Sequence, residues 1–406
     1  MNKNYLLMML FATSLTTFGQ TTLTVGPDWS SGSWSSGTPI AGQATIIDVA
    51  TSNVDADYTQ SRLINTAGAS DVTINGVNKL TIDNDGTLEN ISSTPSIMTI
   101  NCNLRIGGTT QIGSLGADAN NYVFGGNLQG GGTLEFMTNV NATIGATADF
   151  SGYNGNYRVY KGTNLIFDTT NPINGVTGKQ IRQQENGTGT VTINSPNICN
   201  SVQFWCNSGN NRFLNVVFNA NQDNIGKFIL LANSNTTTNA INVTIGPGVT
   251  SLQFEDHSGG GTPVVWAANQ TLNIINFADN VLNFGGVATG LTEEQLAKIT
   301  VDVDTTGKEL TLTSSGDLVL APTLSAKVPF SNVNFSIYPN PVDNILNIES
   351  EEQIAVIQIT DVLGKTITTQ KGKLKSVNTA NFAKGIYILK VFAKNGASTA
   401  KKFIKK

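Results

Sequence analysis

Short stretches of alternating apolar residues recur from about Thr21 to Leu320, and this pattern constrains the fold more than any other feature. Asn-Gly, Gly-Gly, Thr-Gly and Asn-Asp turns separate the stretches, of which Val72–Ile74, Val191–Ile193 and Ile241–Ile245 are typical. Apolar alternation with a period of two is typical of β-strands, and no long segment keeps the period of a helix. The chain is therefore predicted to be all-β.

The same pattern of short strands and turns continues over about 300 residues, which favours a right-handed parallel β-solenoid over a sandwich. The inward positions are mostly Val, Ile, Leu and Phe, which stack in ladders along a solenoid core, and Asn at the turns tolerates a left-handed backbone. At about 20–25 residues per coil, residues 20–320 would form on the order of 12 to 15 coils. In one strand, Leu134 and Phe136 are predicted to face the core and Glu135 to face solvent.

One segment departs from the strand pattern. Thr292 is followed three residues later by Gln295, which is the sequence of a capping box. The sequence therefore predicts a single short helix over residues 292–298.

Parts of this region resemble a known kind of solenoid. Gly126–Phe136 and Phe150–Phe167 are similar to the alternating repeats of autotransporter-type passengers. Trp29–Pro39 resembles the tryptophan-containing start of such solenoids, and Gly290–Ile299 with Gly316–Leu320 resembles their closing coil. The coils between the central repeats and this closing coil depart from the pattern, which leaves their register open.

The N-terminus has the pattern of a secretory signal peptide over residues 1–19. Lys3 precedes the apolar run Tyr5–Ala12, and Thr17–Gly19 places small residues before a cleavage point at Gln20. The run is too short to span a bilayer, and no later stretch has the length of a transmembrane helix. We therefore expect a protein that is exported to the periplasm and onward, with no transmembrane span once the signal is removed.

The charge changes sign along the chain. Residues 20–325 hold 11 basic and 23 acidic residues, whereas residues 326–406 hold 12 basic and 5 acidic residues. Residues 321–332 contain two Pro and little periodicity, which is typical of a linker. The sequence thus predicts two units, over residues 20–320 and 333–406, with different roles.

The C-terminal region carries four motifs in order. The first three contain Tyr338, Pro339, Asn340 and Pro341 at the start, Asp361, Gly364 and Lys365 in a turn, and Gly385 and Tyr387 in a late strand. The chain then ends in the basic stretch Lys401–Lys406. Alternating apolar runs between these motifs predict a small antiparallel β-sandwich.

This combination resembles the type A C-terminal sorting domain of the type IX secretion system of Bacteroidetes. The resemblance covers residues 333–406. It implies that this domain directs export, and it does not imply a catalytic activity. It implies that the type IX secretion machinery is a partner and that the passenger ends as a secreted or outer-membrane cell-surface protein. It also implies that the passenger is released or attached to anionic lipopolysaccharide.

Candidate catalytic groups are few. The only histidine, His257, lies in the polar stretch Glu255–Gly259, which predicts a surface loop. Consecutive residues point in different directions, so this stretch does not form a catalytic triad. One histidine also excludes a zinc site with several histidine ligands. The sequence accordingly offers no catalytic residue, no cofactor-binding residue and no metal ligand set.

Two other features allow more than one interpretation. Asp83–Gly86 and Asp55–Asp57 could contribute ligands to a structural calcium ion, but both lack the extended ligand loop of an EF-hand, so turns are the favoured interpretation. Of the three cysteines, Cys199 and Cys206 are close enough in sequence to form a disulfide, while burial as free thiols is equally consistent with the pattern.

Only 13% of the residues are charged, so a basic nucleic-acid-binding surface is excluded. The favoured function is an adhesin-like or structural β-solenoid without catalysis. It would contact carbohydrate surfaces through Asn, Thr, Ser and a few aromatics. Those aromatics are Tyr153, Tyr157, Tyr160 and Trp205. The alternative is a carbohydrate-active enzyme, either a glycoside hydrolase or a polysaccharide lyase, on the same solenoid.

Overall fold

The structure is a computed structural model. It describes residues 20–406 except 27, 67–70, 92–95, 114–119, 207, 232–237, 259–263, 265, 323–333, 351–352, 373 and 394–397. The chain divides into two compact units, with the boundary between Ala321 and Pro322. The predicted signal peptide and all but the first two residues of the predicted linker lie outside the described residues.

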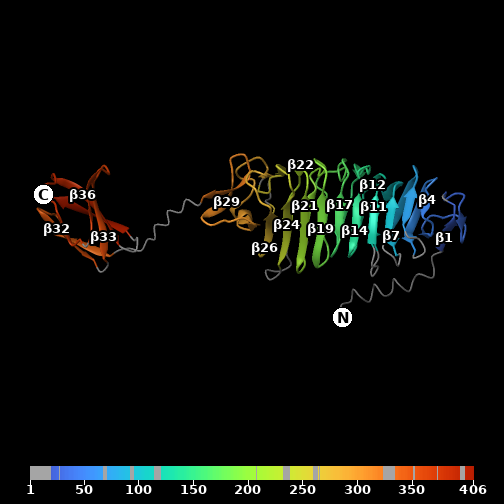
Figure 1. The fold of residues 1–406 in the computed structure, drawn as a ribbon, viewed down its shortest axis with the longest axis horizontal. Coiled ribbons are helices and arrows are strands. Elements are labelled where there is room, and N and C mark those ends of the chain that lie inside the picture. The colour runs from blue at the N-terminus through green and yellow to red at the C-terminus, as the bar shows by residue number, and fades with distance from the viewer. Residues whose placement is uncertain are drawn as a thin grey trace, which may run out of the picture. The chain divides into compact units, whose positions relative to one another are not determined.

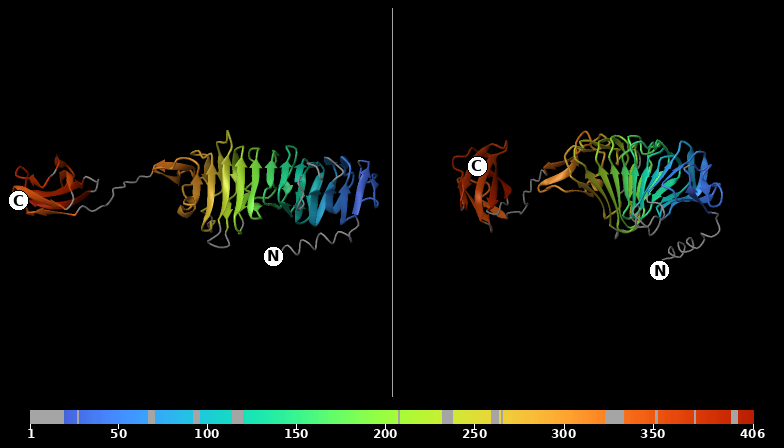
Figure 2. Two further views of the ribbon diagram at one scale, coloured as in Figure 1. Left: turned by 60° about the horizontal axis from the view of Figure 1, so that its bottom comes forward. Right: turned by 45° about the vertical axis from the view of Figure 1, so that its right-hand side comes forward.

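The N-terminal unit is a parallel β-solenoid, as the sequence predicts, and it has about 10 turns. Its strands lie side by side from one coil to the next (Figures 1 and 2). Within the described residues, they form a 14-stranded sheet, an 11-stranded sheet, a 3-stranded sheet and a 2-stranded sheet. Apart from β1 with β2 and the pair that forms the 2-stranded sheet, the hydrogen-bonded neighbours in this unit are strands of successive coils, so local sequence order becomes spatial order.

The 14-stranded sheet contains β1 (Gln20–Val25), β2 (Ser33–Trp34), β3 (Gln43–Ile47), β5 (Tyr58–Asn65), β7 (Lys79–Asn90), β9 (Asn103–Ile106), β10 (Thr110–Ile112), β12 (Leu128–Gly130), β13 (Thr133–Phe136), β15 (Gly152–Tyr153), β16 (Asn156–Val159), β18 (Gln180–Gln183), β20 (Gln203–Cys206) and β23 (Phe228–Leu230). The 11-stranded sheet contains β4 (Thr51–Asn53), β6 (Val72–Asn75), β8 (Ile97–Ile100), β11 (Asn120–Phe124), β14 (Val140–Ile144), β17 (Asn164–Phe167), β19 (Gly187–Ile193), β21 (Arg212–Phe218), β24 (Asn239–Ile245), β26 (Gln270–Ile275) and β28 (Ile299–Val301). The smaller sheets contain β22 (Gln222–Ile225), β25 (Leu252–Phe254) and β27 (Leu282–Phe284), and β29 (Lys308–Leu312) with β30 (Leu318–Pro322).

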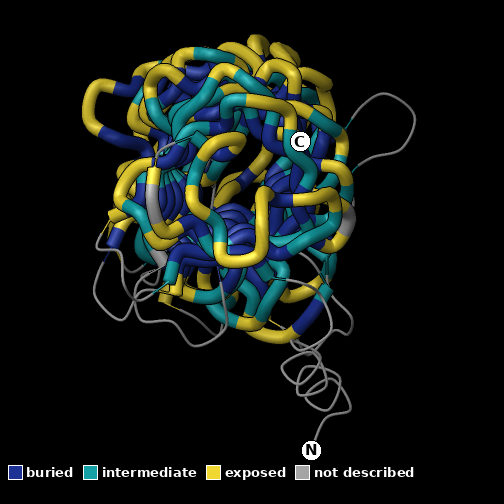
Figure 3. Tube along the Cα trace, turned by 90° about the vertical axis from the view of Figure 1, so that its right-hand side faces the viewer, coloured by how far each residue is buried: buried dark blue, intermediate teal, exposed yellow. Residues whose placement is uncertain are grey.

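The solenoid core consists of inward-facing side chains that stack in register. One row of the 11-stranded sheet alternates between Ile and Phe over seven coils: Ile100, Phe124, Ile144, Phe167, Ile193, Phe218 and Ile245. Each ring therefore has a smaller aliphatic neighbour above and below it, which lets successive layers interdigitate. Buried residues accordingly gather inside the coils, and exposed residues follow the loops (Figure 3).

The coil number is lower than the predicted 12 to 15. Hydrogen-bonded residues in neighbouring coils are 20 residues apart at Asn141 and Asn121, but 31 residues apart at Asn273 and Asn242. The coils thus lengthen toward the C-terminal end of the solenoid. Over the nine coil steps from Thr51 to Ile275, the mean is about 25 residues per coil, which is the upper end of the assumed range.

The orientation of β13 is confirmed, but the expected exposure of Glu135 is wrong. Leu134 and Phe136 are buried, as predicted from the alternation. The side chain of Glu135 is only 7% exposed because it pairs with Arg158 of the next coil, with 2.5 Å between Oε1 and Nη1. Its outward position therefore does not place it in free contact with water.

The predicted capping box is present at the start of helix α2 (Glu293–Leu296). The N–H of Gln295 donates to Oγ1 of Thr292 over 3.2 Å, and the N–H of Thr292 donates to Oε1 of Gln295 over 2.8 Å. These reciprocal bonds satisfy two amide groups that have no partner within the helix. The prediction of a short helix in this segment is confirmed.

The C-terminal unit is built from two antiparallel sheets around a separate core. One sheet contains β31 (Phe335–Tyr338), β32 (Ile345–Ser350) and β35 (Ser376–Asn378), and the other contains β34 (Thr366–Lys371), β33 (Ile354–Asp361), β36 (Gly385–Ala393) and β37 (Ser398–Lys405). Leu346, Ile359, Leu389 and Phe403 are fully buried between them. Apolar alternation in these strands thus produces the expected antiparallel fold.

Candidate functional site

The outward face of the 11-stranded sheet presents two rows of residues in register. The first, named here the asparagine row, contains Asn121, Asn141, Asn164, Thr190, Asn215, Asn242, Asn273 and Thr300. The second, named here the β-branched row, contains Thr51, Thr73, Thr99, Val123, Thr143, Ile166, Thr192, Val217, Thr244 and Ile275. None of these residues is charged or aromatic, so the two rows form a broad neutral strip.

Side-chain hydrogen bonds connect the asparagine row from coil to coil. Asn242 donates from Nδ2 to Oδ1 of Asn215 over 2.8 Å, and Asn273 donates in the same way to Asn242 over 2.7 Å. The hydroxyl of Thr300 donates to Oδ1 of Asn273 over 2.7 Å. Each of these bonds uses one of the four hydrogen-bonding positions of an amide, so the row keeps donors and acceptors for a ligand.

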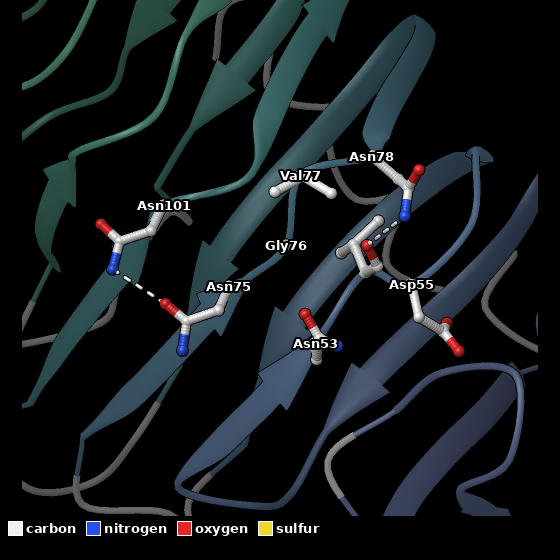
Figure 4. Close-up of a pocket in the computed structure, with 8 residues that line it drawn as sticks. Asn53, Asp55, Asn75, Gly76, Val77, Asn78 and Asn101 are labelled. Carbon is white, nitrogen blue, oxygen red and sulfur yellow. Dashed lines mark hydrogen bonds between the residues drawn. The ribbon is translucent and has the colours of Figure 1, made fainter.

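An open depression of about 560 Å³ borders the same sheet near its N-terminal end (Figure 4). Its lining residues are Asn53, Val54, Asp55, Asn75, Gly76, Val77, Asn78 and Asn101. Asn101 donates from Nδ2 to Oδ1 of Asn75 over 3.0 Å, and Asn78 donates to the carbonyl of Val54 over 3.2 Å. A single carboxylate among amide groups can hydrogen-bond a polar ligand but does not form an acid–base pair.

The two candidate calcium segments are engaged in local contacts. The carboxylate of Asp55 accepts from the N–H of Ser30 over 3.0 Å and also from its hydroxyl. Asp57 pairs with Lys79, and Asp85 has a left-handed φ of 58°. Among the residues that the structure describes, no three His, Cys, Asp or Glu side chains are grouped as a metal would require.

The prediction that His257 lies on a surface loop is wrong, because its side chain is fully buried. The ring centroid lies 5.2 Å from that of Phe284 and 6.0 Å from those of Phe228 and Trp266. Burial lowers the pKa of His257 to about 4. The polar neighbours in the sequence gave no signal of this, since distant coils supply the aromatic surroundings.

The three cysteines are free and buried, so the suggested Cys199–Cys206 disulfide is absent. Burial raises the pKa of Cys102 and of Cys206 to about 12, and that of Cys199 well above its usual value. Thiols of this kind are poor nucleophiles at neutral pH. They act as small apolar residues in the solenoid core.

The predicted surface aromatics divide into two groups. Tyr153 and Tyr157 are fully buried, which contradicts their assignment to the surface. Their rings stack edge to face at 5.2 Å, and the hydroxyl of Tyr153 donates to the carbonyl of Gly132 over 2.8 Å. Tyr160 and Trp205 are half-buried and keep part of their rings accessible.

In the C-terminal unit, the structure joins the first predicted motif to the last strand. Asn340 donates from Nδ2 to the carbonyl of Lys402 over 3.2 Å and accepts at Oδ1 from the N–H of Ile404 over 2.9 Å. The N–H of Val342 then donates to the carbonyl of Ile404 over 2.8 Å. Both peptide bonds before Pro339 and Pro341 are cis. This turn thus ties the start of the unit to its basic C-terminal end.

The other two motifs form a turn and a packed strand. The carboxylate of Asp361 accepts from the N–H groups of Leu363 and Lys365, each over 2.9 Å, and Gly364 has a φ of 84° that suits glycine. Gly385 begins β36, and Tyr387 two residues later stacks on Phe403 of β37 at 5.5 Å. The hydroxyl of Tyr387 donates to the carbonyl of Ala383 over 2.9 Å.

Residues 336–406 match the family model of the secretion system C-terminal sorting domain. This unit is a type IX secretion sorting domain. No curated protein and no solved structure matches the chain. The sorting domain makes the protein a secreted or cell-surface protein and the secretion machinery its partner.

The sorting domain exposes apolar residues on the outer face of its 4-stranded sheet. Ile386 of β36 pairs with Ile404 of β37, and Ile388 pairs with Lys402. The three isoleucines are 40–44% exposed. A neighbouring pair places Lys390 beside Ala400. In the part of the chain that the structure describes, no helix is long and apolar enough to cross a membrane.

Proposed function

We propose that this protein is an exported, adhesin-like β-solenoid without catalysis, whose 11-stranded sheet binds the surface of a neutral polysaccharide. The observation that carries this proposal is the pair of uncharged rows on that sheet. The sorting domain directs export, and the solenoid provides the binding surface.

The chemistry of the two rows suits a neutral polymer with many hydroxyl groups. Amide groups of the asparagine row can exchange hydrogen bonds with sugar hydroxyls, and methyl groups of the β-branched row can contact the apolar edges of the sugar rings. Neighbouring strands are about 4.8 Å apart and alternate residues along a strand about 6.7 Å apart, so the side chains form a regular grid. A regular grid favours a partner whose own surface repeats.

We also propose how the chain is exported and where it ends. Residues 1–19 would act as a signal peptide that delivers the chain to the periplasm, as in secretion by Bacteroidetes. The outer face that carries Ile386, Ile388 and Ile404 would then contact the secretion machinery. The passenger would finally be released or attached to anionic lipopolysaccharide at the outer membrane.

Co-sedimentation with insoluble neutral polysaccharides, such as cellulose, chitin and curdlan, tests the binding face. The variants Thr192→Lys and Val217→Lys place a charge at the centre of the β-branched row and should weaken binding about tenfold or more. Gln111→Lys makes the same change on the other sheet and should leave binding unchanged. Equal binding by all variants would contradict the assignment, and release of new reducing ends would favour the glycosidase alternative.

Deletion of residues 333–406 tests the export proposal. The solenoid has its own core, so the truncated chain should fold but accumulate in the periplasm. Protease accessibility on intact cells would distinguish surface display from retention. Surface display of the truncated chain would overturn the proposal that this unit directs export.

A further inference from the structure

The outward face of the 14-stranded sheet differs from the neutral strip because it carries charged and aromatic residues in one register row. In the strand register, Glu135 of β13 lies beside Arg158 of β16, and Arg158 lies beside Arg182 of β18. Arg182 in turn lies beside Trp205 of β20. Consecutive members belong to successive coils and are thus about 4.8 Å apart at the backbone. Four side chains from four distant segments therefore share one small area.

Specific contacts hold these side chains in place. Nη1 of Arg158 lies 2.5 Å from Oε1 of Glu135. Cζ of Arg182 lies over the ring of Trp205, 5.0 Å from its centroid. A cation over an indole ring at this distance is an attractive arrangement. The row is therefore ordered before any ligand arrives.

Neutral amides complete the arrangement. Arg182 donates from Nη2 to Oε1 of Gln180 over 2.6 Å, and Trp205 donates from Nε1 to Oε1 of Gln203 over 3.0 Å. Gln180 and Gln203 are themselves in register. Both amides accept bonds from the row, which leaves their own N–H groups to face a ligand.

The positive charge of this area is only partly neutralised. The four neighbouring strands β16, β18, β20 and β23 carry Arg158 and Arg182 but no acidic residue. Arg212 is also close to Arg182, and the nearby carboxylates are Glu135 and Glu185, so three guanidinium groups share two carboxylates. Gln180, the acceptor of Arg182, has no charge. Burial and the nearby charges of Arg158 and Arg212 hold the pKa of Arg182 below its usual value. Two adjacent guanidinium groups in an otherwise acidic unit favour the binding of an anionic ligand.

We propose that Arg158, Arg182 and Trp205 form a binding site for an acidic saccharide. The guanidinium groups bind its carboxylate or sulfate oxygens, for which their planar geometry is suited. Gln180 and Gln203 donate to the sugar hydroxyls, and the accessible part of the Trp205 ring contacts the apolar edge of the sugar. This site is separate from the neutral strip and does not depend on the function proposed for it.

Binding by the full-length protein can be measured with three soluble polymers. Alginate carries carboxylates, dextran sulfate carries sulfate esters, and dextran is neutral, so the comparison identifies the anionic group. We expect binding to at least one of the two anionic polymers, weakened by salt, and none to dextran. Equal binding of dextran, or binding of neither anionic polymer, would overturn the proposal.

Two variants of the row should change the affinity in opposite directions. Arg182→Ala removes a guanidinium group and should weaken binding about tenfold or more. Glu135→Gln removes the carboxylate that competes for Arg158 and should strengthen binding. Arg105→Ala is the matched control, because Arg105 is exposed on the same sheet but outside the row. Urea melts of each variant confirm that the solenoid remains folded.

The outcomes separate this site from the proposed function. An affinity of Arg182→Ala equal to that of the unmodified chain would overturn the site. The variants Thr192→Lys and Val217→Lys should keep full affinity for the acidic polymer, whatever their effect on neutral polysaccharide. Unsaturated products released from alginate would leave the site supported but would overturn the proposal of a protein without catalysis.

Discussion

The backbone N–H of Phe228 donates a hydrogen bond to Nε2 of His257 over 2.9 Å. Nδ1 of the same ring lies 2.7 Å from the carbonyl oxygen of Glu255 and serves as the donor of that bond. Both ring nitrogens are thus satisfied only by a neutral imidazole protonated at Nδ1. Protonation of Nε2 would break the bond to Phe228 and bury a charge among aromatic rings.

Stability of the solenoid should therefore fall in mild acid. Burial lowers the pKa of His257 to about 4, whereas an unfolded chain has a histidine pKa of about 6.5. The unfolded state binds the additional proton between these values, so this contribution is complete above about pH 6.5 and is lost as the pH falls toward 4. The loss should reach at most about 3 kcal/mol.

Urea melts at several pH values, followed by tryptophan fluorescence, measure this effect. All four tryptophans lie in the solenoid, so the signal reports that unit alone. His257→Gln keeps an acceptor for Phe228 but cannot take up a proton, and it should flatten the pH dependence between 4 and 6.5. An identical slope for both proteins would contradict the role of His257.

Much of the solenoid could be predicted because its inward rows produce an apolar alternation within each short strand. Ile193 and Phe218 occupy the same position in successive coils, and each follows an outward residue in its own strand. Apolar alternation within three to five residues is therefore sufficient to identify the strands. The sorting domain could likewise be recognised, since its motifs are local sequences.

The outward rows could not be predicted for a physical reason. Asn141 and Asn164 are 23 residues apart, whereas Asn242 and Asn273 are 31 residues apart. Because the loops vary in length, no fixed period in the sequence connects the members of a row. Only the hydrogen-bond register between strands aligns them. For the same reason, the proximity of Arg182 to Trp205 could not be predicted from the sequence.

The two neighbours Glu135 and Phe136 should both matter for stability. Phe136→Ala removes a buried ring and should cost about 3–5 kcal/mol. Glu135→Ala leaves the guanidinium group of Arg158 without its carboxylate and should cost about 1–3 kcal/mol. Glu309 is exposed, so Glu309→Ala should change stability by less than about 0.5 kcal/mol. Urea melts of the three variants would show this order, and equal shifts for Glu135→Ala and Glu309→Ala would contradict it.

The native protein should not react with thiol reagents. Cys102, Cys199 and Cys206 are buried, and burial raises their pKa values, so little thiolate is accessible at pH 8. Titration with Ellman's reagent should detect no thiol in the folded chain and three thiols in urea without reductant. Detection of only one thiol in urea would reveal a disulfide that the structure does not contain.

Loss of the Asn340 side chain should loosen the end of the sorting domain. Asn340→Ala removes two hydrogen bonds to β37 and leaves the N–H of Ile404 without its acceptor. The cost of about 1–3 kcal/mol should speed amide exchange at Ile404 by about five- to a hundredfold. Asn344→Ala is a suitable control, because Asn344 is exposed and its backbone carbonyl, which accepts from Thr379 over 2.7 Å, is kept. If Ile404 exchanges at the same rate in both variants, Asn340 does not join the first motif to the last strand. If exchange rises while export continues at the normal level, the junction stabilises the domain but is not what the secretion machinery recognises.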